Sequence, residues 1–151
     1  MIKLLLFIGV AAVTFGPVAV WAETLPKGAT KLTEQEVRSM YEGQSSDWKS
    51  TRAFFSADGS VVLVRKDKSL YGEGRWAVNG NKMCMTINWT RTETGKRGST
   101  DDCYTWHKSG NRYLTRWSGD QNKADGYSDE EPSRLSAGDK VSQQISELKS
   151  N

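Results

Sequence analysis

The sequence predicts a mainly β protein: a small antiparallel meander that closes into a barrel or a strongly curved sheet, with one helix packed on it. From Trp48 onward, short runs rich in β-branched and aromatic residues alternate with turn dipeptides. The connections between these runs are only a few residues long, which favours antiparallel neighbours. Two cysteines, Cys84 and Cys103, fall in adjacent runs and can join them by a disulfide.

The N-terminus has the pattern of a cleavable export signal. Lys3 precedes an apolar run over residues 4–20, and the small-residue rule places the cut after Ala22. An uncleaved membrane anchor is the alternative, since the run is nearly long enough to cross a bilayer. Gly16 and Pro17 argue against an anchor because they weaken a spanning helix. We therefore expect no stable membrane span after cleavage.

A capping pattern predicts the first helix. The Thr33 hydroxyl can accept a hydrogen bond from backbone N–H groups of the first turn, and the Glu36 carboxylate can accept one from the backbone N–H of Thr33. Apolar residues at helical spacing form one stripe: Leu32, Val37, Met40 and Tyr41. Because Gly43 is a natural stop, we predict a helix over residues 34–42 that packs over one end of the sheet.

Six strands are predicted after this helix. They cover residues 53–56, 61–64, 70–78, 83–90, 102–107 and 113–117. Asp58-Gly59 supplies the first tight turn, because this dipeptide tolerates positive φ values. Gly72 and Gly74 lie inside a strand, where glycine permits a bend or the close approach of a neighbour. The predicted shape is calycin-like.

The cysteines and the hydrophobic alternation agree on one register between two of these strands. Met83, Met85, Ile87 and Trp89 share one face of their strand, and Cys84 lies on the other. If Cys84 faces Cys103, three further pairs follow: Met83 with Tyr104, Thr86 with Asp101, and Asn88 with Ser99. The bond should contribute roughly 3 kcal/mol by the chain-entropy account.

The chain is divided into three parts by these patterns. Residues 1–22 are the signal, and residues 23–117 form a single β domain. Residues 118–151 are a polar linker and a short C-terminal helix. The linker, residues 118–137, carries a sparse acidic run and is predicted to be an exposed connection. Apolar residues at helical spacing predict the marginal helix that follows: Val141, Ile145 and Leu148.

Large aromatic side chains are numerous for so small a domain. Two of them lie on strand faces that otherwise carry apolar residues and are predicted to be core: Trp76 and Trp89. Trp106 and Trp117 lie near strand ends beside polar residues, so we predict an exposed rim there. Such rings can stack on sugars or on apolar ligands. Tyr71 and Tyr113 complete the candidate ligand-binding residues.

No catalytic constellation, metal or cofactor is predicted. His107 is the single histidine, and no serine on a nucleophile elbow accompanies it. A hydrolase could use a carboxylate pair, Glu73 with Asp101 or Asp102. Two cysteines without a second pair make no metal site. The interspersed charges, with a formal net charge of +3, give no reason to expect nucleic acid or an anionic membrane as the partner.

The order of several short motifs carries a family resemblance. The motifs are Lys27-Gly28-Ala29, Leu32-Thr33, Trp48, Phe55, Asp58-Gly59, Gly74-Arg75-Trp76, Met83-Cys84, Trp89 and Cys103. Over residues 27–117 the chain resembles the family known as domain of unknown function 995, small exported proteins of alphaproteobacteria. The resemblance implies a periplasmic or secreted Gram-negative protein with a compact, disulfide-bonded β domain. It transfers no active site, and the tail from Ser118 onward has no counterpart in it.

These features lead to a ranked set of functions. The first is an exported, non-catalytic binding protein that engages an apolar or sugar ligand in the barrel mouth, or an envelope protein along a strand edge. The second is an inhibitor or structural partner of an envelope or secreted protein. A hydrolase that uses carboxylates is the third, and it requires such a group to converge on a cleft.

Overall fold

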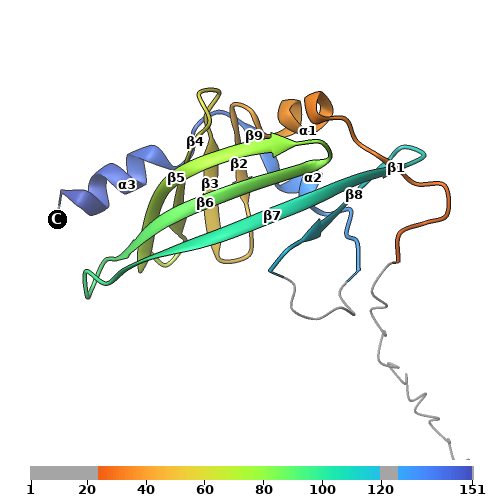
Figure 1. Ribbon diagram of the computed structural model, residues 1–151. Helices are drawn as coiled ribbons and strands as arrows, with labels where there is room; N and C mark the ends of the chain where they lie inside the picture. Colours follow the sequence, from red (N-terminus) through yellow and green to blue (C-terminus); the bar gives the residue numbers. More distant parts are fainter. Residues whose placement is uncertain (1–23, 120–125, 151) are drawn as a thin grey trace, which may run out of the picture.

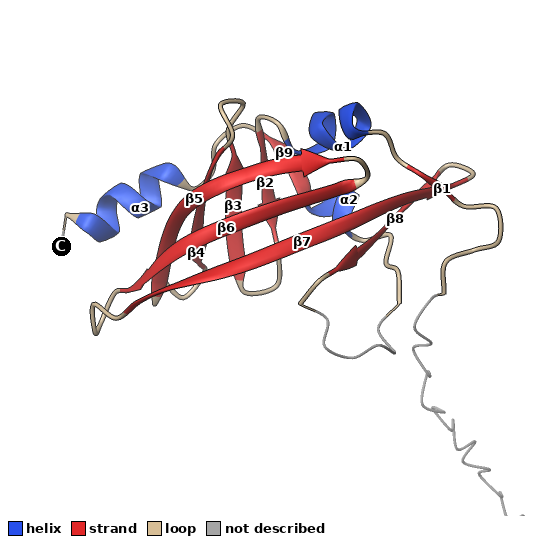
Figure 2. Ribbon diagram, in the orientation of Figure 1, coloured by secondary structure: helices blue, strands red, loops and turns tan. Residues whose placement is uncertain are grey.

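The computed structural model describes residues 24–119 and 126–150, so the predicted signal and its cut after Ala22 lie outside the described residues. Within these ranges one strongly curved antiparallel sheet carries three short helices (Figures 1 and 2). The strands are β1 Thr30–Lys31, β2 Gln44–Asp47, β3 Thr51–Phe55, β4 Ser60–Arg65, β5 Leu70–Asn79, β6 Lys82–Arg91, β7 Arg97–Ser109, β8 Arg112–Trp117 and β9 Leu135–Ala137. The helices are α1 Glu34–Tyr41, α2 Glu131–Arg134 and α3 Ser142–Lys149.

Strands β3 to β8 form the predicted meander, each antiparallel to the next. The long strand β7 also pairs with β1, and β2 and β9 extend the sheet beyond β3. Among the described strands no pairing joins β8 to β9, so the sheet is a curled half-barrel rather than a closed barrel. The mainly β prediction is confirmed, whereas the short strands β1, β2 and β9 were not predicted.

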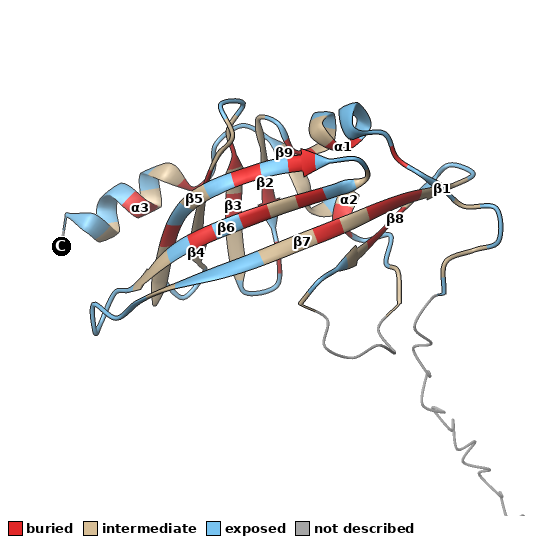
Figure 3. Ribbon diagram, in the orientation of Figure 1, coloured by how far each residue is buried: buried red, intermediate tan, exposed pale blue. Residues whose placement is uncertain are grey.

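The strands divide their side chains between an inner and an outer face. The inner face carries Phe55 from β3, Trp76 from β5, and Met83, Met85 and Ile87 from β6, all buried (Figure 3). Helix α1 covers one end of this face through Val37 and Tyr41. The predicted capping box is present, and α1 ends at Tyr41, one residue earlier than predicted.

Two inner-face glycines let β5 and β6 approach closely. A Cβ atom at Gly74 would lie 1.8 Å from the backbone oxygen of Thr86. At Gly72 it would lie 2.5 Å from Cγ2 of Ile87. A change of side-chain rotamer cannot relieve a clash with backbone, so this strand pairing requires glycine at position 74.

The outer face is partly covered by α3, which confirms the predicted C-terminal helix. Val141 and Ile145 pack against Val64 of β4, with Tyr71 at the edge of this cluster. Asp139 accepts hydrogen bonds from the backbone N–H groups of Val141, at 2.9 Å, and Ser142, at 3.0 Å. Docking on the sheet supplies the burial that a helix this short requires.

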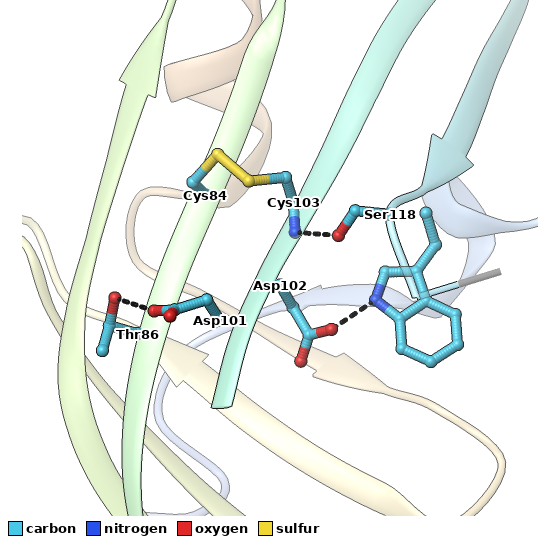
Figure 4. The surroundings of a disulfide bond; sticks show 7 residues. Cys84, Thr86, Asp101, Asp102, Cys103 and Ser118 are labelled. Atoms are coloured by element: carbon cyan, nitrogen blue, oxygen red, sulfur yellow. Dashed lines mark hydrogen bonds between the residues drawn. A yellow bond between two sulfur atoms is a disulfide. The ribbon is translucent and has the colours of Figure 1, made fainter. Parts of the chain in front are cut away.

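The disulfide joins β6 to β7 on the outer face in the predicted register. Cys84 and Cys103 are bonded, with their Cα atoms 4.1 Å apart. Met83 faces Tyr104, Thr86 faces Asp101 and Asn88 faces Ser99, as predicted. The Thr86 hydroxyl donates to Asp101 at 2.5 Å, and the Cys103 amide donates to the Ser118 hydroxyl at 2.8 Å; both hydrogen bonds are drawn in Figure 4.

The segment predicted to be an exposed connection is folded where the structure describes it. Strand β9 pairs with β2, and Ser128 forms a β-bridge with Thr115. Glu131, at the start of α2, is only 2% exposed. Strand pairing and the burial of Glu131 therefore tie residues 126–137 to the sheet, whereas Ser128, Asp129 and Glu130 are exposed, as predicted for this acidic run. No helix in the described ranges is long and apolar enough to cross a membrane.

Candidate ligand-binding site

A cavity of about 620 Å³ lies on the inner face of the half-barrel. Its walls are mostly apolar, and Leu63, Leu70, Met85 and Ile87 line it from β4, β5 and β6. Residues 126–134 supply a further wall through Gly126, Ser128 and the start of α2. The volume falls within the roughly 300–1,000 Å³ range of small-molecule sites.

Aromatic rings in the cavity wall are held by hydrogen bonds and by glycines. The indole N–H of Trp89 donates to the Thr100 hydroxyl at 3.2 Å. The indole ring packs directly on Gly98: a Cβ atom at this position would lie only 2.3 Å from Cζ2 of Trp89. The indole N–H of Trp117 donates to Asp102 at 2.8 Å. These contacts fix the rings without a ligand, so the cavity is preformed.

Trp48 and Tyr104 form a second aromatic wall. Their rings are stacked, with centroids 5.8 Å apart and planes 4° from parallel. Trp48 comes from the turn between β2 and β3, and Tyr104 comes from β7. The curvature of the sheet thus brings together two rings that are 56 positions apart in the sequence. No local sequence pattern predicts this contact.

Glu131 places a buried carboxylate in this wall. The Trp48 indole N–H donates to both carboxylate oxygens, at 2.9 and 3.0 Å, and the Ser46 hydroxyl donates to Oε1 at 3.2 Å. The nearest cation, Arg134, is 3.6 Å away and is closer to the exposed Glu130. Burial raises the pKa of Glu131, although the Trp48 donor, the Arg134 charge and the Ser46 donor act to lower it.

The raised pKa of Glu131 predicts a pH-dependent contribution to stability. The folded protein holds this proton more tightly than the unfolded chain does, so the free energy of unfolding falls as pH rises from 4.5 through the raised pKa. The variant E131Q carries no such proton. We expect wild type to lose stability relative to E131Q as pH rises from about 5 to about 8 in urea unfolding.

The quantity to compare is the difference in free energy of unfolding between wild type and E131Q at each pH. Burial lowers the pKa of His107 below 6.5, so this residue has the opposite effect: stability is lost as pH falls through that region. Both proteins contain His107, and its contribution cancels in the difference. D129N is the control, because Asp129 is a nearby exposed carboxylate that pairs with Arg112 rather than with Arg134. A difference that is flat in pH would contradict the assignment to Glu131.

The four predicted ligand-binding residues do not lie together in the structure. Trp117 is 39% exposed and lines the cavity. Trp106 is fully buried, so the prediction that it lies on an exposed rim is wrong. Tyr71 lies on the outer face beside α3, and Tyr113 packs against the core without lining the cavity.

The carboxylates considered for hydrolysis are also separated. Glu73 pairs with Lys149 of α3. Asp101 is on the outer face with Thr86, whereas Asp102 lines the cavity and accepts from Trp117. In the part of the chain that the structure describes, no group of three or more His, Cys, Asp or Glu side chains is arranged to hold a metal ion.

Fold and site together define a disulfide-bonded antiparallel half-barrel with an apolar cavity on its inner face. The sequence matches the family described as protein of unknown function (DUF995) over residues 7–141, and the chain belongs to this family. The match extends past residue 117 and includes the segment that carries Glu131. No curated protein and no solved structure matches the chain.

Proposed function

We propose that this chain is an exported, non-catalytic protein that binds a small ligand with a substantial apolar part in the inner-face cavity. The observation that carries the proposal is the cavity itself: about 620 Å³, walled mainly by apolar side chains and by rings already fixed in place. Sites of this kind, with a few placed polar groups, are typical of small-ligand binding.

Two features support a location outside the cytoplasm. The Cys84–Cys103 bond is the chemistry of an oxidising compartment. The N-terminal sequence has the pattern of a cleavable export signal. A periplasmic or secreted protein of a Gram-negative bacterium accommodates both features.

The distribution of apolar surface favours a small ligand over a protein partner. Among the described residues, Trp117 is the large hydrophobic side chain that is exposed, and it belongs to the cavity wall. Protein-binding surfaces usually present larger contiguous apolar patches. Apolar recognition is therefore concentrated at the cavity, and the inhibitor hypothesis receives no comparable support.

Binding of the neutral dye Nile red tests this function. We expect the wild-type protein to enhance its fluorescence saturably, and W117A to weaken the affinity by about fivefold or more because a wall of the cavity is lost. Y113A is the matched control, since Tyr113 is an aromatic residue on the same strand outside the cavity. Absence of saturable binding to wild type, or equal effects of the two variants, would overturn the proposal.

A further inference from the structure

We infer that the ligand of this cavity carries a protonated amine, which Glu131 binds, on an apolar body that contacts the cavity walls. This inference rests on the proposed function and specifies the chemical class of its ligand. It is carried by the incomplete compensation of the Glu131 charge, the rings beside it, and an unsatisfied hydroxyl in the same cavity.

The negative charge of Glu131 is buried, and a single cation, shared with Glu130, compensates it only in part. Its hydrogen-bond donors, Trp48 and Ser46, are neutral groups. Arg134 lies 3.6 Å from Oε2, and its shorter contact is with Glu130. A buried carboxylate whose one cation is held closer to another carboxylate is costly, and a ligand ammonium would supply both further charge and N–H donors.

The rings next to Glu131 are suited to the same cation. Trp48, which donates to the carboxylate, is also stacked on Tyr104, and both rings line the cavity. Aromatic faces attract ammonium groups within about 6 Å of the ring centre, and the attraction grows when the group is desolvated. A carboxylate bordered by aromatic rings favours an amine over a neutral hydroxyl.

Thr115 gives an independent indication that a polar ligand group enters the cavity. Its side chain lines the cavity from β8 and is only 6% exposed. Its hydroxyl has no hydrogen-bond partner among the described residues. Buried hydroxyl groups are nearly always satisfied, so this one is expected to bond to a ligand or to water. Contact between α2 and β8 brings its strand next to the element that carries Glu131.

Basic side chains at the cavity edge present the main competing possibility. Lys49, Arg65 and Arg134 also line the cavity and could attract an anionic head group. The Arg65 side chain is 39% exposed and lies 3.6 Å from Asp67, so solvent and this carboxylate screen part of its charge, although its buried Nε has no hydrogen-bond partner among the described residues. Because electrostatic interactions strengthen as water is excluded, the buried Glu131 should outweigh these cations, which are more exposed than it is.

Three probes with the same apolar chain separate these head groups: decylammonium, decanol and decanoate. Binding to the complete mature protein is measured by isothermal titration calorimetry at about pH 8, where the amine is protonated and the acid is ionised. We expect decylammonium to bind wild type about tenfold or more tightly than decanol does, as a charge-assisted hydrogen bond predicts. Decanoate should bind more weakly than decanol.

Two variants assign the preference to the proposed groups. E131Q should remove most of the tenfold preference for decylammonium and leave decanol binding nearly unchanged. D129N is the control, because Asp129 is an exposed carboxylate two positions from Glu131 that pairs with Arg112 and does not line the cavity, so this variant should retain the preference. T115V preserves the side-chain shape and should lower decylammonium affinity about threefold or more. It provides a second test if E131Q does not fold.

The outcomes distinguish this inference from the function on which it rests. If decanol binds but decylammonium is not preferred, or if the preference survives in E131Q, the cavity binds apolar ligands and the amine assignment is wrong. Preferential binding of decanoate would assign the head group to the basic side chains Lys49, Arg65 and Arg134 instead and would also overturn the inference. If none of the three probes binds and Nile red does not bind either, the proposed function itself fails.

Discussion

Replacing Trp106 by alanine (W106A) is expected to lower the free energy of unfolding by about 3–5 kcal/mol, the range for removing a large aromatic side chain from a packed core. The Trp106 ring is fully buried and meets Tyr41 of α1 in an edge contact, with centroids 6.0 Å apart. Most of the loss should come from the cavity that truncation leaves in the core.

Urea unfolding followed by far-ultraviolet circular dichroism measures this loss, and W117A is the control. Trp117 has the same side chain, but it is 39% exposed, and truncating it removes chiefly the hydrogen bond to Asp102. We expect about 1 kcal/mol of destabilisation for W117A. Equal losses in the two variants would show that the core around α1 does not depend on the Trp106 ring.

The contrast between these two tryptophans shows where sequence reasoning fails. Both lie near the end of a predicted strand beside polar residues, and this local pattern predicts the same environment for the two. Trp106 is buried because α1 and the chain before it return to cover this end of the sheet: Tyr41 packs on its ring, and the Leu32 amide donates to its carbonyl at 3.4 Å. Such coverage is a long-range property that alternation along one strand cannot reveal.

Local patterns are sufficient to predict the meander itself. Alternation, turn dipeptides and the cysteine pair together determine the register of β6 against β7, because a shift of one residue would exchange the inner and outer faces. The same reasoning predicts α1, because the residues that cap and end this helix lie next to it in the sequence. Short distances along the chain explain this success.

Sequence reasoning missed Glu131, the central residue of the candidate site, because its burial depends on contacts distant in the sequence. Glu131 follows Asp129 and Glu130 in what reads as a solvated acidic run. It is buried because β9 returns to pair with β2, which brings Glu131 to Trp48, 83 positions earlier in the chain. The polar residues of β2 gave no hydrophobic signal for that pairing, and only the isolated Leu135 in β9 suggested burial.

Removing the disulfide with the double variant C84A/C103A is expected to lower the free energy of unfolding by roughly 3 kcal/mol. The two residues are 19 positions apart, and in the chain-entropy account the loss reflects a less restricted unfolded state rather than lost native contacts. Urea unfolding with and without dithiothreitol measures it: the reductant should destabilise wild type by a similar amount and leave the double variant unchanged.

The double variant should still bind ligand, because the bond and the cavity lie on opposite faces of the sheet. Cys84 and Cys103 are on the outer face, whereas Met85 and Tyr104, each the next residue along the same strands, line the cavity. The β6–β7 ladder runs from Lys82 opposite Thr105 to Thr90 opposite Arg97, and its backbone pairing holds the wall in place without the sulfur bridge. Nile red affinity within about twofold of wild type is therefore expected wherever the variant is folded. A folded double variant that has lost the affinity would mean that the bond shapes the cavity directly, and that the disulfide acts on the native state as well as on the unfolded chain.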